Sequence, residues 1–263
     1  MNQFDGGLMC GSYFKSFCKY SVQEYTDARN HKFCLKIHEN GDPTKVFCKT
    51  EYLNHFLQNV SIEHQFDLLT HNSDISIGPE DYKNAHHFQP KLRYWYAQNL
   101  MGEHPMMKVL PIGLANPKWD HGDQEIVSSV RSQNPEKTNM VDVSFDIYTN
   151  QSVRQYCLDQ IQLPMRDRAP FKEHLELLAS SFFCISPDGN GVDCHRHWEA
   201  LYLKTIPIVT KSFLVDSLKD KGLPFLIIEN WSDFKSLDLS PDLYYNVWKN
   251  FDPDRVNALF INE

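Results

Sequence analysis

The sequence predicts an α/β fold built around a parallel sheet. From about residue 140 onward, short apolar runs alternate with segments of helical periodicity, which is typical of βαβ units. The apolar runs are continuous, as expected of strands covered on both faces. The length of 263 residues accommodates one large domain or two small ones of roughly 100–150 residues each.

In the second half, strands and helices follow one another in a regular order. "MVDVSFDIY" (140–148) predicts a strand and "QSVRQYCLDQI" (151–161) predicts a helix. In such sheets, ligands bind where the strands end at their carboxyl side. The further expected strands are 182–186, 206–210 and 224–230, and the further expected helices are 169–181, 193–204, 212–222 and the closing segment 242–261, which could pack back across the first half.

The first half is harder to interpret. Strands or strand-to-loop segments are expected at 66–72, 92–100 and 108–116, whereas residues 1–60 show no clear pattern. A candidate domain boundary lies at "PKWDHGDQ" (117–124), which contains a proline, a glycine and several charged residues. Two domains, 1–118 and 119–263, are therefore expected.

The bulk composition excludes several classes of function. The 26 Lys and Arg against 34 Asp and Glu give a net charge of −8. The chain therefore lacks the excess of positive charge that is typical of nucleic-acid-binding proteins. No apolar run approaches the roughly 18–20 residues of a membrane span. The N-terminus lacks a signal-peptide pattern, although loss of an anchor stays open. Seven scattered cysteines without C-x-x-C spacing favour reduced thiols in a cytoplasmic compartment.

The stretch "SPDGNGVDCHRHWEALYLKTIPIVT" (186–210) carries the strongest indication of chemistry. Asp193, Arg196 and Glu199 recur every third residue, which would place them along one face of a helix. Gly191, just before it, allows a ligand to come close, and free N–H groups at a helix start suit a diphosphate. Arg196 can donate two hydrogen bonds to phosphate, while Glu199 can accept from a ribose diol. The alternative is an Arg–Glu pair on a solvated helix face.

"CISPDGNGVDCHRHWEALYLKTIPIV" resembles the C-terminal signature of the exostosin-like glycosyltransferases (family 47). In that signature, a D-x-x-R-x-x-E-A helix precedes a short apolar strand containing "IPI" or "IPV". "LLTHNSD", "WYAQNL…KVLPIGLANPKW" and "VDVSFDIYTNQSVR" are similar to the same group, including its short bacterial and large-virus members. The resemblance extends from about Phe66 to Phe234.

The resemblance implies a GT-B fold, in which two small Rossmann-like domains face a cleft. Residues 1–118 would bind the acceptor, and residues 119–263 would bind the nucleotide sugar. The implied activity is transfer of a sugar, with inversion, from a nucleotide diphosphate donor to a carbohydrate hydroxyl. The expected donor is a UDP-sugar, with UDP-xylose slightly favoured. No cofactor or metal is expected, and a viral chain would act in the host cytoplasm.

Inversion requires a base that takes the proton of the acceptor hydroxyl. Asp74, in the loop after the expected strand 66–72, is the first candidate, and its alternative role is an Asx-turn or a helix cap. His71 is the second candidate, and a buried structural histidine is the alternative reading for it.

Further residues follow the expected strands. Candidate donors to the diphosphate are Ser144, Thr149, Asn150 and Arg154, with turn formation and capping as the alternative for Thr149 and Asn150. Candidates for an acceptor-sugar platform are Trp95, Tyr96 and Asn99, and the alternative for the aromatic residues is the core. Asn230, Trp231 and Phe234 could flank the base or the sugar.

Three competing interpretations receive less support from the sequence. A metal enzyme is disfavoured because His195 and His197 are two apart on an expected helix, and "DPD" (252–254) is better explained as a turn. An oxidoreductase would need G-x-G-x-x-G, and "GNG" stands alone. A non-catalytic module of the same fold that binds a nucleotide sugar or a carbohydrate stays open as the alternative function.

Overall fold

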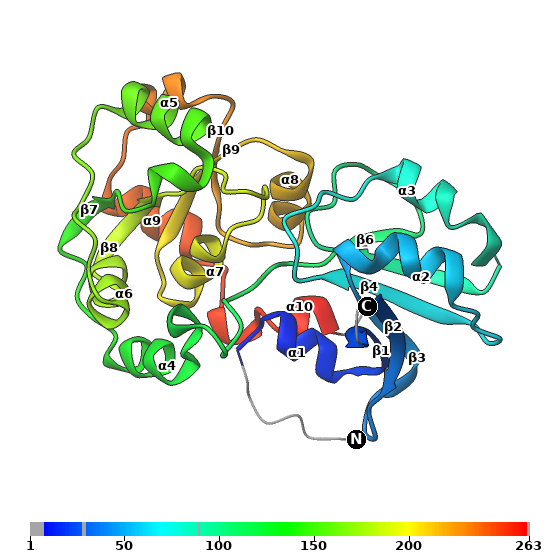
Figure 1. Cartoon of the computed structure of the whole chain (residues 1–263). Helices are drawn as coiled ribbons and strands as arrows, with labels where there is room; N and C mark the ends of the chain where they lie inside the picture. Colours follow the sequence, from blue (N-terminus) through cyan, green and yellow to red (C-terminus); the bar gives the residue numbers. More distant parts are fainter. Residues whose placement is uncertain (1–7, 28–29, 89, 262–263) are drawn as a thin grey trace. The chain divides into compact units, whose positions relative to one another are not determined.

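The computed structural model describes residues 8–27, 30–88 and 90–261 (Figure 1). The chain divides into two compact units. Of the described residues, one unit comprises 9–112, and the other comprises 113–261 together with Leu8. The division falls between 112 and 113, six residues before the expected boundary between 118 and 119.

The unit 9–112 contains a six-stranded mixed sheet in the order β2-β1-β3-β4-β5-β6. β1 and β2 form an antiparallel hairpin at one edge, and the other neighbouring strands are parallel. The first three strands lie where the sequence showed no clear pattern. The strands are β1 (Cys18–Asp27), β2 (Asn30–Ile37), β3 (Asp42–Lys49), β4 (Phe66–His71), β5 (Leu92–Ala97) and β6 (Met107–Val109).

Aromatic side chains form the centre of this unit. The rings of Phe56 and Phe88 stack with their centroids 5.2 Å apart, and Phe66 meets Phe88 edge-on at 5.5 Å. All three are buried, so they join a helix, a strand and a 3-10 turn into one core. The helical elements are α1 (Gly11–Ser16), α2 (Leu53–Asn59), α3 (Pro79–Asn84) and the 3-10 turn η2 (His86–Phe88).

The unit 113–263 contains a four-stranded parallel sheet in the order β10-β9-β8-β7 (Figure 1). The predicted α/β class and the parallel sheet are confirmed. The GT-B arrangement concerns how two such units face each other, and it stays a prediction. The strands are β7 (Asn139–Asp142), β8 (Ser181–Ile185), β9 (Ile206–Thr210) and β10 (Leu226–Ile228).

Helices cover both faces of this parallel sheet. On one face, Phe183, Ile185, Ile206 and Ile208 share a core with side chains of α5, η5 and α9. Alternate strand residues point to the opposite face, where α4, α6 and α7 pack on one another. The helical elements are α4 (Gln124–Gln133), η4 (Ile147–Asn150), α5 (Gln151–Ile161), α6 (Phe171–Ala179), α7 (His195–Tyr202), α8 (Phe213–Asp220), η5 (Trp231–Ser236), α9 (Pro241–Trp248) and α10 (Ala258–Ile261).

Two boundaries near the functional loops differ from those expected. The strand predicted over 140–148 ends at Asp142, because the carbonyl of Val143 accepts a hydrogen bond from the Arg166 amide at 2.8 Å instead of continuing the ladder. The helix predicted over 193–204 begins at His195, so Asp193 lies before the N-cap residue Cys194.

The closing helices pack on their own unit. The Tyr244 hydroxyl of α9 donates to the carbonyl of Lys204 at 2.7 Å, and Phe260 of α10 meets Trp198 edge-on. Within the described ranges, the helices are all too short or too polar to cross a bilayer.

Gly41 gives a test of the fold of the unit 9–112. A Cβ at Gly41 would lie 2.3 Å from the carbonyl oxygen of Cys18 and 2.4 Å from its carbon, both in the backbone of β1. Gly41→Ala should therefore lower the free energy of unfolding by about 1–3 kcal/mol, because the strand must shift. The midpoint of urea unfolding measures the loss.

Gly78→Ser is the matched control for this substitution. A Cβ there meets nothing within 4 Å, Gly78 is the N-cap of α3, and serine is a preferred N-cap residue. Equal unfolding midpoints for the two variants would contradict the packing assigned to Gly41.

Candidate functional site

The candidate site lies where β7 and β8 end in the unit 113–263. Residues 143–150 follow β7, and residues 186–194 follow β8 and lead into α7. Both loops leave the carboxyl edge of a parallel sheet, which is where α/β proteins bind ligands.

The loop 186–194 is folded around the thiol of Cys194. The sulfur accepts a hydrogen bond from the Gly189 amide at 3.1 Å and lies 3.7 Å from the carbonyl oxygen of Pro187. Burial raises the pKa of Cys194 to about 12, so this group stays a neutral thiol. Gly191 is buried in the same loop, and its carbonyl accepts from the Gly189 amide at 3.1 Å. The loop is therefore held in shape by its own contacts.

Arg154, in the first turns of α5, ties the two loops together. Its Nε donates to the carbonyl of Asp188 at 3.0 Å, and its Nη1 donates to the carbonyl of Asp146 at 2.5 Å. The side chain is 6% exposed. Burial and the nearby charge of Arg196 lower its pKa, yet arginine remains protonated in proteins. The Arg154 guanidinium therefore places a positive charge between the loops 143–150 and 186–194.

Arg196, the second residue of α7, brings a second positive charge to the same place. The guanidinium carbons of Arg196 and Arg154 lie 5.5 Å and 5.7 Å from the centre of the Phe145 ring. The Nε of Arg196 is buried and has no hydrogen-bond partner in the described part of the chain. Leaving a buried donor unsatisfied costs about 1–3 kcal/mol, so Arg196 carries a donor that the described residues do not satisfy.

A second unsatisfied group starts the same loop. The hydroxyl of Ser186 is buried without a partner among the described residues, directly after the end of β8 at Ile185. A hydroxyl can donate to phosphate oxygen. This residue was not singled out by the sequence analysis, because a serine at a strand end has no distinctive spacing.

Glu199 lies one turn after Arg196 on α7 and is 7% exposed. Its Oε2 is 3.6 Å from Nε2 of His174. Burial by itself would raise the pKa of Glu199, but the interaction with His174 and the charge of Arg196 outweigh it, and the pKa lies below the ordinary value. Glu199 is therefore a buried carboxylate, and the alternative of an Arg–Glu pair on a solvated helix face does not describe it.

Asp193 is placed differently from the expectation. Its side chain is fully buried, its Oδ1 accepts from the indole Nε1 of Trp198 at 2.8 Å, and Nδ1 of His197 lies 3.4 Å from the same oxygen. The carboxylate points into the protein, because Asp193 precedes the helix and does not share a face with Arg196. We assign Asp193 to holding the start of α7.

The other expected donors after β7 also hold the loops. Nδ2 of Asn150 donates to the carbonyl of Gly189 at 2.8 Å, and the Thr149 amide bonds the carbonyl of Asp146 at 3.4 Å. The hydroxyl of Ser144 donates to the carboxylate of Asp142. These contacts match the turn-forming alternative for Thr149 and Asn150.

The residues expected to flank the base or the sugar are mostly internal. Trp231 is 2% exposed and Phe234 is 8% exposed, and both belong to the sheet core. Asn230 accepts a hydrogen bond from the hydroxyl of Tyr156 at 2.8 Å. Asn230 thereby joins η5 to α5.

In the unit 9–112, His71 is fully engaged. It is 1% exposed, its Nδ1 accepts from the Asn72 amide at 2.7 Å, and its Nε2 is 3.0 Å from the carbonyl oxygen of Pro111. Since a carbonyl only accepts, Nε2 carries the proton and Nδ1 is occupied. His71 therefore has no free nitrogen with which to take a proton.

Asp74 lies in the loop that follows β4, and its side chain is exposed. The preceding residues are held firmly, because Gln98 and Asn99 both donate to the carbonyl of Ser73, at 2.7 Å and 3.2 Å. Asp74 is therefore an accessible carboxylate after a well-held segment, and its role as the base stays a prediction.

The expected acceptor platform is buried. Trp95 is 0% exposed, and its Nε1 donates to the hydroxyl of Thr70 at 2.9 Å. Asn99 is also 0% exposed and Tyr96 is 6% exposed. These side chains lie inside the unit 9–112, where they cannot offer a face to a sugar, so Trp95 and Asn99 belong to the core and to the support of the Asp74 loop.

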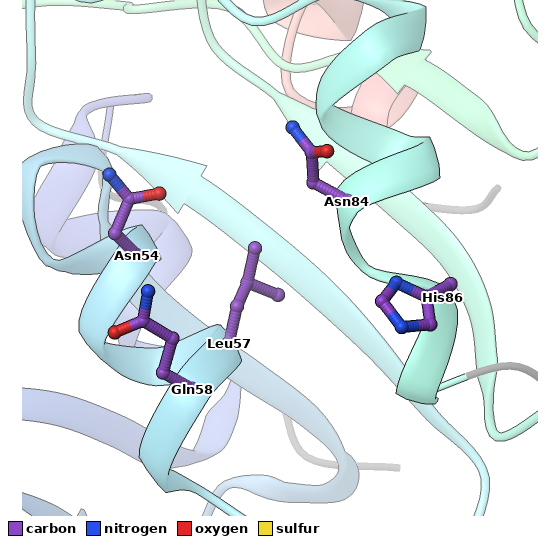
Figure 2. Close-up of a pocket in the computed structure, with 5 residues that line it drawn as sticks. All are labelled: Asn54, Leu57, Gln58, Asn84 and His86. Atoms are coloured by element: carbon purple, nitrogen blue, oxygen red, sulfur yellow. The ribbon is translucent and has the colours of Figure 1, made fainter.

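A groove of about 530 Å³ lies between α2 and the segment from α3 to η2. Figure 2 shows the carboxamides of Asn54 and Gln58 on α2 across the gap from Asn84 and His86, with Leu57 between them. Among the described residues, the lining consists of amide side chains, an imidazole and a leucine, with no carboxylate, lysine or arginine. Such a groove suits neutral hydroxyl groups and is unsuited to a diphosphate.

Within the described ranges, no group of three or more His, Cys, Asp and Glu side chains is placed to hold a metal ion. Comparison of the chain with protein-family models and with curated proteins finds no match. The functional argument therefore rests on the geometry of the site.

Gly189 gives a test of the site's geometry. A Cβ at this residue would lie 3.1 Å from Nη2 of Arg154 and 3.3 Å from the Cys194 sulfur. Gly189→Ala should displace the guanidinium by a few tenths of an ångström, so affinity for inorganic pyrophosphate should fall about tenfold, the equivalent of one weakened charge-assisted contact. Titration calorimetry at constant ionic strength measures this change.

Gly102→Ala is the matched control for crowding. A Cβ there would lie 3.2 Å from the ring of Pro79, in the unit 9–112, so pyrophosphate affinity should be unchanged. If both variants bind pyrophosphate as the unsubstituted protein does, Gly189 does not shape an anion site.

Proposed function

We propose that this chain is a glycosyltransferase that uses a nucleotide diphosphate sugar. The observation that carries the proposal is the Arg196 guanidinium, which lies over the Phe145 ring as that of Arg154 does, and whose buried Nε has no partner among the described residues. These groups lie at the carboxyl edge of a parallel sheet, the usual ligand-binding edge of this fold.

The charge balance favours a diphosphate. Two guanidinium groups near each other repel, and the charge of Arg196 contributes to lowering the pKa of Arg154. A dianionic group between them removes that repulsion and satisfies the Arg196 donor. Guanidinium forks match pairs of phosphate oxygens, and the chain as a whole, at −8, would repel an anion without such a local site.

Glu199 would bind the ribose of the nucleotide whose phosphate Arg196 binds. It is three positions after Arg196, which corresponds to about 4.5 Å along a helix axis. A nucleoside diphosphate presents its ribose diol next to its α-phosphate, so one helix can offer a donor to the phosphate and an acceptor to the diol. The low pKa of Glu199 keeps the carboxylate ionised for this role.

The transfer itself needs a base and an acceptor. Asp74 is the base that we propose, because its side chain is exposed while both nitrogens of His71 are engaged. In a GT-B arrangement the unit 9–112 would supply this base and bind the glycan acceptor. Arg154 and Arg196 would stabilise the leaving diphosphate without a metal ion. The resemblance to the exostosin-like enzymes supports a UDP-sugar donor and inversion, with UDP-xylose as the first donor to try.

Arg196→Ala tests the phosphate site. The variant should lose about 1.5–3 kcal/mol of binding free energy for UDP, roughly a ten- to hundredfold loss of affinity, because a charge-assisted contact is removed. Its affinity for uridine, which has no phosphate, should not change. Calorimetry with both ligands measures the difference.

Lys172→Ala, which removes an exposed cation of α6, is the control for the charge change and should bind UDP normally. The phosphate site is refuted if the unsubstituted protein does not bind UDP, or if Arg196→Ala binds it equally well.

Asp74→Asn tests the base. Turnover, measured as UDP released from UDP-xylose, UDP-glucuronic acid, UDP-galactose or UDP-N-acetylglucosamine in the presence of glycan acceptors, should fall about 10²-fold or more. UDP affinity should stay within about twofold, because the residue belongs to the other unit. A variant that turns over normally or loses UDP binding would exclude this role. An unsubstituted protein that binds UDP-sugars but transfers none of them would be the non-catalytic module.

A further inference from the structure

A continuous chain of polar side chains runs through the unit 113–263 and ends at Glu199. The Ser144 hydroxyl donates to Asp142, and Nε of Arg166 donates to Oδ1 of Asp142 at 2.8 Å. Nη2 of Arg166 then lies 2.9 Å from Nδ1 of His174. His174 Nε2 finally faces Oε2 of Glu199 at 3.6 Å.

Arg166 determines which nitrogen of His174 carries the proton. A guanidinium group has donors and no acceptor, so Nδ1 must accept its hydrogen bond. With Nδ1 accepting from Arg166, the N–H that His174 can present to Glu199 is the one on Nε2. At 3.6 Å this contact is longer than an ordinary hydrogen bond, and its polar attraction directs Oε2 of Glu199 toward the ring.

Arg166 is itself held in place from two directions. Its side chain pairs with Asp142, whose carboxylate is 3% exposed, and its backbone amide donates to the carbonyl of Val143 at 2.8 Å. The segment between α5 and α6 is thus fastened to the end of β7. Because the guanidinium is fixed, the orientation of the His174 ring on α6 is fixed as well.

Glu199 receives its orientation from this chain. With Oε2 directed at His174, the other carboxylate oxygen is available to a ligand, one turn from Arg196 on the same helix. A long carboxylate side chain has several rotamers, and ordering it at the moment of binding reduces affinity. An orientation fixed in advance removes that cost.

We propose that His174 is a positioning residue that presents Glu199 to the ribose diol, so that this site prefers ribonucleoside diphosphates to their deoxy analogues. The inference rests on the proposed function, since it requires the ligand of Arg196 to be a nucleotide. His174 does not touch the ligand; it acts through Glu199. A purely structural role, in which His174 only packs α6 on α7, would weaken all ligands of the site alike.

The test compares UDP with 2′,3′-dideoxyuridine diphosphate by titration calorimetry. The unsubstituted protein should prefer UDP by about ten- to hundredfold, the equivalent of a charge-assisted interaction with the diol. In His174→Ala, UDP affinity should fall until the preference is within about threefold, while the affinity for the dideoxy compound should stay unchanged. Glu199→Ala should show the same loss of preference.

Two further variants complete the design. His174→Gln should retain the preference, because its amide oxygen can accept from Arg166 and its amide N–H can donate to Glu199. Lys172→Ala, on the same helix but paired with Glu176, should behave as the unsubstituted protein. If His174→Ala does not fold, His174→Asn replaces it with the same expected result, since its shorter amide cannot reach both partners.

The outcomes separate the two proposals. If the unsubstituted protein binds both nucleotides equally, or if His174→Ala keeps the preference, weakens both ligands alike, or is not rescued by His174→Gln, the role of His174 is refuted and the diphosphate site stands. If neither nucleotide binds, the proposed function fails and this inference fails with it.

Discussion

The site is organised around one incomplete interaction, the Arg196 guanidinium over the Phe145 ring with a buried Nε that has no partner among the described residues. A fully bonded arginine would indicate a structural role. The unsatisfied donor of Arg196, near the same aromatic ring as Arg154, is the reason for proposing that a negatively charged group binds here, since burying an unpaired donor is unfavourable. The phosphate site, the role of Glu199 and the positioning by His174 all depend on this group.

The surrounding contacts keep the charged groups in place before a ligand arrives. Arg154 joins the two loops through backbone carbonyls, and the Cys194 thiol holds the loop 186–194 from inside. Such preorganisation matters for transfer reactions, because donors that are already oriented stabilise the developing charge of a leaving diphosphate without further rearrangement. The same principle supports the role proposed for His174, which is itself held by Arg166.

The fold was predictable in the second half and much less so in the first. Helix α5 begins and ends at the predicted residues, and so does β9, because continuous apolar strands and helical spacing are distinct in a parallel sheet. The hairpin of β1 and β2 was not predicted, since the edge strand β2 alternates half-buried and exposed positions over residues 33–36 and offers no apolar run. In the site, Arg196 and Glu199 were found from their spacing, whereas Asp142, Arg166 and His174 come from separate segments and have no common spacing.

The sequence by itself determined the α/β class, the place of the candidate loops at the strand ends and the two residues of α7 that we propose to bind the nucleotide, because periodicity and spacing are local properties. Only the tertiary structure decided which polar side chains turn inward. Asp193, His71 and Trp95 each had a functional interpretation, and each is buried against partners. Burial and hydrogen bonding depend on segments far apart in the chain. His71 of β4, for example, contacts the carbonyl of Pro111, and no local sequence pattern contains that information.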